Sequence, residues 1–222
     1  LALVLHKPNF DKKILEREKK RYISSISQSD VMPATIASKA FMSALYGDHP
    51  YGLSSSGEAN TIEKIIKKDL DNFYKNNYLS NELSIVIVGD ISQKEAEGIG
   101  QKISLGFTEN KMVSSIPLVR DKKGEEIRIN HPAKQAHLYY GAPIIKRGDP
   151  DFLSLYLGNY ILGGGGFVSR LTQVIREDRG LAYSVYSYFM PYIEAGPFQI
   201  GVQTKKNQVN QAKDLIEKTV SD

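Results

Sequence analysis

The sequence predicts an α/β fold in which mixed, largely antiparallel sheets are flanked by helices. Short β-branched runs bounded by turn residues indicate strands, and stretches with a helical apolar stripe and capping residues alternate with them. No repeat of 20 to 50 residues is present, which argues against a solenoid. The 222 residues are 41% hydrophobic and 24% charged, so the chain is long enough to bury a real core.

The individual elements follow from these signals. Helices are expected from a cap at Asp11 to residue 26, over 33–45, from a cap at Asn60 or Thr61 to residue 74, from a capping box of Ser92 and Glu95 to residue 103, over 151–162, over 169–179, and after a cap at Asn207. Strands are expected over 83–88, 126–131, 135–142, 182–190 and 197–204. The polar stretch 108–125 is typical of a linker.

The two ends of the sequence predict a fragment of a longer protein. The apolar start, closed by Lys7 and Pro8, is typical of the last turn of a helix, and the other end stops inside an amphipathic pattern.

Composition excludes several functions. The 29 Lys and Arg against 25 Asp and Glu are spread along the chain, which argues against nucleic acid as the main partner. No run approaches the roughly 20 apolar residues of a membrane span. The absence of cysteine removes disulfides, thiolate zinc sites and a cysteine nucleophile.

The chemistry-bearing residues form no familiar motif by themselves. The four histidines lack the i, i+4 spacing of a zinc-binding helix, and His131 and His137, which flank a turn, lack a third ligand nearby. The four glycines at 163–166 follow a helix rather than a strand and precede no Lys-Ser or Lys-Thr, so a close-packed or flexible turn is favoured over a phosphate loop.

Several segments taken in order resemble the pitrilysin/insulinase-type zinc metallopeptidases, which include the mitochondrial processing peptidases and bacterial homologues. The segments are FDKKILEREKK from residue 10, HPYG from 49, DLDNFYKNNYLSNELSIVIVGDIS from 69, and LGGGGFVSRLTQVIREDRGLAYSVYS from 162. The resemblance implies two similar α/β domains that face each other across a peptide-holding cavity. It implies the C-terminal half of the first domain at 1–107, a linker at 108–125 and the N-terminal part of the second domain at 126–222.

The resemblance also implies that this chain holds no zinc. The family binds zinc through a His-x-x-Glu-His helix, which is absent here, and through a distal Glu. Aligning the Phe-Asp segment places Glu18 on the family's supporting Glu and Ser25 on the position of the distal ligand. A serine hydroxyl is a poor zinc ligand compared with a carboxylate. Zinc is therefore expected in a partner or in an upstream segment.

The second domain keeps the residues that the family uses at the substrate. Arg176 and Tyr183, within REDRGLAY, match the Arg and Tyr that reach the active site from the facing domain, where they would hold the substrate backbone and stabilise the oxyanion. We include Gly164, Gly165 and Gly166 as expected substrate-binding residues. Without the resemblance, Arg176 would be interpreted as an exposed helical residue and Tyr183 as a half-buried strand residue.

The function that follows is a non-metal subunit that supplies Arg176 and Tyr183 in trans to a homologous zinc-bearing subunit in a heterodimer, or to a second copy in a homodimer. Two alternatives stay open: a single-chain zinc peptidase whose His-x-x-Glu-His lies upstream, and a non-enzymatic peptide-binding or scaffold subunit. The compartment stays open, although the lack of cysteine and the resemblance to bacterial paired homologues favour a bacterial periplasm.

Overall fold

The computed structural model describes residues 1–80, 83–107, 115–120 and 122–222. Contacts divide the chain into two compact units. Unit 1 comprises Leu1–Ser27 and Gly57–Ser114, and unit 2 comprises Gln28–Ser56 and Ser115–Asp222. The sequence-based domain boundaries follow the expected family domains rather than these contacts, and they stay a prediction.

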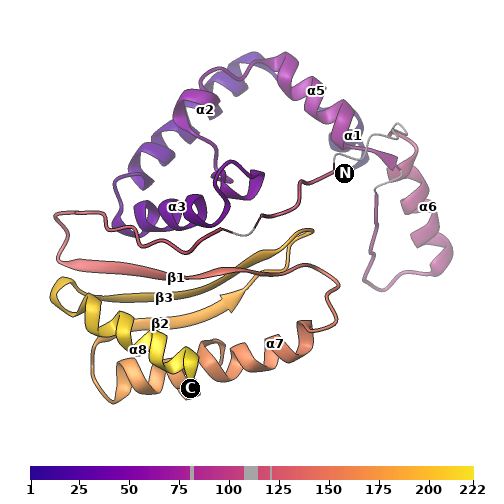
Figure 1. The fold of residues 1–222 in the computed structure, drawn as a ribbon. Helices are drawn as coiled ribbons and strands as arrows, with labels where there is room; N and C mark the ends of the chain where they lie inside the picture. Colours follow the sequence, from indigo (N-terminus) through magenta and orange to yellow (C-terminus); the bar gives the residue numbers. More distant parts are fainter. Residues whose placement is uncertain (81–82, 108–114, 121) are drawn as a thin grey trace. The chain divides into compact units, whose positions relative to one another are not determined.

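The helices and strands described for unit 1 are all helices, joined by irregular segments. Its helices are α1 (Ala2–His6), α2 (Lys12–Ser29, which continues into unit 2), α4 (Ala59–Ile62), α5 (Lys67–Asn77) and α6 (Gln93–Ser104) (Figure 1). Asp11 caps α2 as predicted, because its Oδ1 accepts hydrogen bonds from the N–H groups of Lys13 and Ile14 at 2.8 and 3.1 Å. The predicted capping box of α6 is also present, since Ser92 and Glu95 bond each other's backbone N–H groups. The helix expected from residue 60 to 74 is instead broken into α4 and α5, with Glu58 rather than Asn60 or Thr61 at the first N-cap.

The strand predicted over 83–88 does not form, and that prediction is wrong. Residues 83–88 have no regular secondary structure, and Val86 and Val88 are 87% and 93% exposed. A strand is stable only when its backbone groups pair with a neighbour, and within the described ranges no strand of the sheet pairs with this segment.

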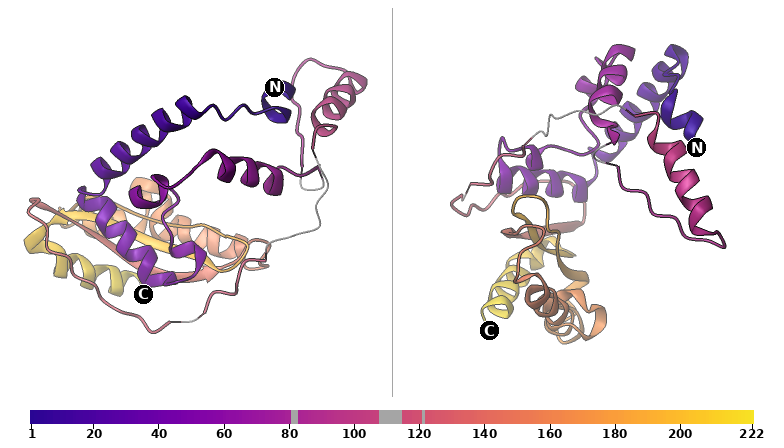
Figure 2. Two further views of the ribbon diagram at one scale, coloured as in Figure 1. Left: turned by 90° about the horizontal axis from the view of Figure 1, so that it is seen from above. Right: turned by 90° about the vertical axis from the view of Figure 1, so that its right-hand side faces the viewer.

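Unit 2 is built on a three-stranded antiparallel sheet. The strands are β1 (Gln135–Ile145), β2 (Ala182–Phe189) and β3 (Gly196–Lys205), in the order β1-β3-β2. Helix α3 (Pro33–Tyr46) lies over one face of the sheet, and α7 (Phe152–Asn159) and α8 (Val209–Ser221) lie on the other (Figures 1 and 2). The α/β fold class with an antiparallel sheet is therefore confirmed.

Three of the four strands predicted for this part of the chain are present, and one is absent. The strand expected over 126–131 does not form, and these residues are mostly exposed. Glu126 is instead held by side chains, because its carboxylate pairs with Arg128 and with Lys213 of α8.

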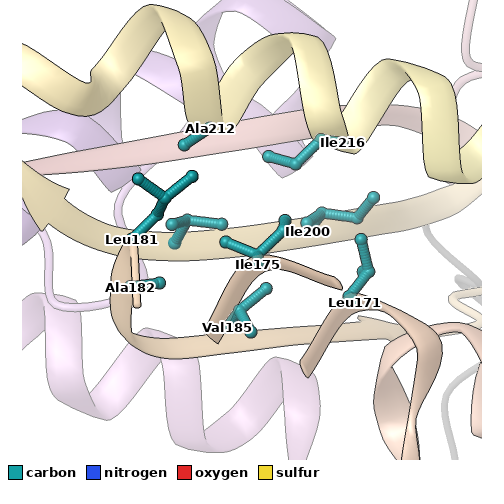
Figure 3. Packing of buried hydrophobic residues seen from close by; sticks show 9 residues of the cluster. Leu171, Ile175, Leu181, Ala182, Val185, Ile200, Ala212 and Ile216 are labelled. Carbon is teal, nitrogen blue, oxygen red and sulfur yellow. The ribbon is translucent and has the colours of Figure 1, made fainter. Parts of the chain in front are cut away.

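A compact core joins the sheet to its helical layer. Figure 3 shows the core side chains converging from α8, β2, β3 and the segment before β2. The fully buried members Leu171, Ile175, Ile200, Ala212 and Ile216 are each 0% exposed. Each fully buried Leu or Ile side chain contributes about 1.5–3 kcal/mol relative to an exposed one.

The helical segments near β2 are irregular. The helix predicted over 151–162 is α-helical only to Asn159 and continues as a π-helical turn over Tyr160–Gly164, and the helix predicted over 169–179 is π-helical over Thr172–Glu177. Asn207 is not the cap of the last helix, because it lies in a 3₁₀ turn and Gln208 takes the N-cap of α8.

Candidate functional site

Arg176 and Tyr183 lie on the two sides of one tight turn in unit 2. The π-helical segment Thr172–Glu177 is followed by a turn at Gly180, whose φ of 59° suits a residue without a side chain. The N–H of Gly180 donates to the carbonyl of Arg176 at 2.8 Å, and the N–H of Leu181 donates to that of Ile175 at 3.0 Å. Because Ile175 and Leu181 are both buried, the turn is anchored in the core. The backbone that carries Arg176 and Tyr183 is therefore held in place.

Tyr183 occupies a β-bulge at the start of β2. Ala182 pairs with Thr204 of β3, whereas Ser184 pairs with Gln203, so Tyr183 is the extra residue in the register. Bulges often re-aim a side chain next to an active site. Tyr183 is 79% exposed, so its side chain is available to a ligand.

The side chain of Arg176 is only partly buried and is held by two neighbours. Its guanidinium carbon lies 4.8 Å from the ring centroid of Phe167, and its Nε lies 3.5 Å from Glu177 Oε1. A cation over an aromatic face contributes about 0.5–1 kcal/mol at an exposed site. No hydrogen bond joins Arg176 to Tyr183 among the described residues, although both belong to the same helix–turn–strand unit.

Phe167 is the functional candidate that the sequence did not single out. It is 69% exposed and sits between the glycine loop and Arg176. The only sequence signal for it is an aromatic residue directly after four glycines, a position where an apolar core residue is equally expected.

The glycine-rich loop packs closely, as the sequence predicted for a turn. A Cβ on Gly164 would lie 2.5 Å from Asn159 Nδ2, and a Cβ on Gly165 would lie 2.7 Å from the carbonyl oxygen of Tyr160. Gly166 has φ 65° and open space around it. These contacts explain the glycines sterically, and the substrate-binding role of Gly164, Gly165 and Gly166 stays a prediction.

Of the two residues that the resemblance places on the metal side, Glu18 is engaged in ion pairs. Glu18 accepts from Arg21 at 2.6 Å through Oε2 and from Arg17 at 3.0 Å through Oε1. The hydrogen bonds from Arg21 and then Arg17 lower the pKa of the Glu18 carboxyl. Ser25 is exposed on the same helix.

The histidines are engaged separately. His6 Nε2 contacts the carbonyl of Ile103 at 2.7 Å, and His49 accepts from the N–H of Tyr51 and contacts the carbonyl of Pro117. His131 lies in an irregular segment and accepts from the N–H of Ala133, whereas His137 lies within β1. In the part of the chain that the structure describes, no group of three His, Cys, Asp or Glu side chains is placed to hold a metal ion.

Comparison with known proteins identifies the family. The peptidase M16 inactive domain matches residues 64–222. The chain belongs to the M16 peptidase family. The resemblance to pitrilysin/insulinase-type peptidases is thereby confirmed, and the chain contains the domain that the M16 description calls inactive.

Individual M16 relatives carry different names. An uncharacterized zinc protease, YmxG, of Bacillus subtilis is 28% identical over 221 residues, which is 100% of this chain and 53% of the relative. A protein of Helicobacter pylori called a non-peptidase homolog is 28% identical over 232 residues, which is 99% of this chain and 52% of the relative. The crystal structure of a peptidase M16 inactive domain from Pseudomonas fluorescens is 34% identical and superposes with a TM-score of 0.95, covering 99% of this chain and 53% of that one.

The chain thus spans about half the length of these relatives. Zinc, which the names of some M16 relatives imply, does not fit the described residues. Protein zinc sites use at least three protein ligands, and the carboxylate of Glu18 is already shared between two arginines while Ser25 offers only a hydroxyl. None of the helices among the described residues is both long and apolar enough to cross a membrane.

Proposed function

We propose that this chain supplies the substrate-holding side of an M16 peptidase in which a homologous partner supplies the zinc. Arg176 and Tyr183 hold the peptide backbone and donate hydrogen bonds to the carbonyl oxygen on which negative charge develops. Donors of this kind act on the transition state more than on the bound substrate, and removal of one such donor typically costs about 10²–10³ in kcat.

The observation that carries the proposal is the bulge that presents Tyr183. At this residue β2 leaves the register with β3 and presents an aromatic side chain with a terminal hydroxyl to solvent. Bulges that re-aim a side chain are over-represented next to active sites as well as at sheet edges. Arg176 is presented from the other side of the same turn and remains partly exposed. The π-helical backbone around Arg176 supports the proposal, because such irregularities are frequent at functional sites.

Within this proposal each residue has a distinct task. The guanidinium of Arg176 provides several N–H donors in a planar fork, which suits the carbonyl groups of an extended peptide. The hydroxyl of Tyr183 provides one donor on a rigid ring. The cation–π contact with Phe167 restrains the arginine before the peptide arrives, which lowers the entropy lost on binding.

The experiment is to measure zinc content and peptide cleavage for the full-length protein alone and after mixing with a copurifying M16 homologue that carries His-x-x-Glu-His. The expected result is no zinc and no cleavage for this protein alone, and cleavage after mixing. Stoichiometric zinc and full cleavage by the unmixed protein would instead establish the single-chain zinc peptidase, and a His-x-x-Glu-His upstream would explain it.

A second function, that of a non-enzymatic peptide-binding or scaffold subunit, is favoured by one specific finding. A relative that covers almost the whole of this chain is called a non-peptidase homolog. Peptide binding without cleavage, even when the zinc-bearing homologue is present, would establish this second function.

A further inference from the structure

A small hollow lies on the sheet of unit 2, apart from the turn that carries Arg176. Its volume is about 160 Å³, and it is lined by His137, Tyr139, Ser184, Tyr186, Val202 and Gln203. All three strands contribute to it. A cavity of about 150 Å³ admits a benzene-sized ring.

A glycine of β3 lies between two of the tyrosines that line the hollow. Gly201 pairs with Tyr139 of β1 on one side and with Tyr186 of β2 on the other. A Cβ on Gly201 would lie 2.4 Å from the Tyr186 ring, so a larger residue would collide with the wall of the hollow. The ring of Tyr186 stacks on that of Tyr188, with ring centroids 5.9 Å apart and an interplanar angle of 11°.

The lining is polar and contains no Asp, Glu, Lys or Arg. Gln203 donates from Nε2 to Gln135 at 2.6 Å, which leaves its carbonyl oxygen as an acceptor, and Ser184 and the imidazole of His137 each offer a donor and an acceptor. Burial lowers the pKa of His137, and burial together with the neighbouring Tyr186 raises the pKa of Tyr139 to about 12. Both groups are therefore held uncharged near neutral pH.

Such a lining selects against charged ligands. A charged side chain would lose its hydration without gaining a counter-ion, whereas an uncharged ring with a hydroxyl would find both donors and acceptors. A purely apolar ring would fit but would offer no hydrogen bond to the partly buried polar groups of the lining.

We propose that this hollow is a subsite for an uncharged, ring-bearing side chain with a hydrogen-bonding tip, a phenol above all, on the peptide that Tyr183 contacts. The inference rests on the proposed function and adds a substrate preference to it. Ser184, which lines the hollow, is the next residue after Tyr183 on the bulged start of β2, so the hollow begins within one residue of Tyr183. A peptide held at Tyr183 therefore has this hollow beside it.

The test uses four fluorescein-labelled peptides that are identical except for one central residue, which is Tyr, Phe, Lys or Glu. Their affinities for the full-length protein are measured by fluorescence polarisation. The Tyr peptide is expected to bind about fivefold more tightly than the Phe peptide, the ratio that one neutral hydrogen bond provides. The Lys and Glu peptides are expected to bind more weakly than either.

Two variants then test whether the preference for the Tyr peptide arises in the hollow. His137→Ala and Tyr186→Phe are each expected to bring the ratio of Tyr to Phe affinity towards one. Tyr186→Phe removes only a hydroxyl and keeps the wall, so it remains informative if His137→Ala destabilises the fold. The matched controls are His131→Ala, outside the sheet, and Tyr140→Phe, which neighbours Tyr139 on β1 but does not line the hollow.

The outcomes separate the inference from the function on which it rests. If the wild type binds Tyr and Lys peptides equally, or if both variants keep the preference for Tyr, the subsite is overturned. In that case, loss of cleavage by Tyr183→Phe in the mixed enzyme would show that the proposed function still stands. If the wild type binds none of the four peptides, with or without the zinc-bearing homologue, both the subsite and the proposed function are overturned.

Discussion

The apolar segment 83–88 and strand β3 make an instructive comparison. The segment LSIVIV is rich in β-branched residues and looks like the better strand, whereas β3 contains two glycines, a proline and two glutamines. Yet 83–88 is irregular and exposed, while β3 is central to its sheet and mostly buried. The intrinsic preference for a strand is thus weaker than the pairing that neighbours on both sides provide.

The two pairs of candidate functional residues also differ in how well the surrounding structure supports them. Glu18 and Ser25 lie seven residues apart on one helix of unit 1, and Glu18 satisfies its charge with neighbouring arginines. Arg176 and Tyr183 are also seven residues apart, but they lie on two sides of a turn anchored in the core of unit 2. Only the second pair is presented by a turn whose flanking residues, Ile175 and Leu181, are buried in a core.

The largest expected effect is on stability. Ile200→Ala removes a fully buried side chain from β3 and should lower the free energy of unfolding by about 2–5 kcal/mol. Val86→Ala changes an exposed side chain and should alter it by less than about 0.5 kcal/mol. Urea unfolding followed by circular dichroism checks both, and equal effects would show that 83–88 is packed after all.

A smaller, local effect is expected in unit 1. Ser92→Ala removes the N-cap of α6 and should destabilise that helix by about 1 kcal/mol. Amide hydrogen exchange should accelerate in α6 while β3 stays protected. Ser104→Ala, at the other end of the helix, is the control, and a loss of protection in β3 would mean that the two regions are energetically coupled.

His137 should produce a modest pH dependence. Because burial lowers its pKa, the unfolded chain takes up a proton at a higher pH than the folded one, so the stabilisation is complete above the ordinary value of 6.5 and is lost as the pH falls below it. His137→Gln should flatten this part of the stability curve, and His131→Gln should leave it unchanged. Thermal melts between about pH 5 and 8 measure it, since the ordinary histidine pKa lies within that range.

The smallest expected effect is on zinc binding, where we expect a substitution to produce no gain in affinity. Ser25→Glu introduces a carboxylate at the position where the family resemblance predicts a ligand, but we expect the 222-residue chain to remain without zinc, because no group of three His, Cys, Asp or Glu side chains among the described residues is placed to hold a metal ion. Isothermal titration with zinc tests this. Binding of one ion per chain would show that a single carboxylate completes a site.

Much of the fold was predictable from local signals, and the errors share a cause. Caps such as Asp11 and the Ser92–Glu95 box act within a few residues, so the sequence alone reveals them. The strands at 83–88 and 126–131 were predicted from composition, but strands depend on partners that composition does not reveal. The break between α4 and α5 is likewise not indicated by the apolar stripe from which a single helix was predicted.

The candidate site was predictable only through the family resemblance. Nothing in the spacing of Arg176 and Tyr183 shows that β2 bulges at Tyr183, because the bulge is defined by the register with β3. The contact between Arg176 and Phe167 depends on how the chain turns between them. The hollow depends on the register of three strands, which the sequence does not show.

The most direct test of the central claim is the turnover of the mixed enzyme with Tyr183→Phe or Arg176→Ala in this chain. Tyr156→Phe, on α7, and Arg170→Ala serve as exposed controls of the same residue types. We predict that Tyr183→Phe lowers kcat by about 10²–10³ with little change in KM, as expected for a donor that acts in the transition state. An unchanged kcat in both variants, with the controls also unchanged, would contradict the account and leave this chain as a scaffold.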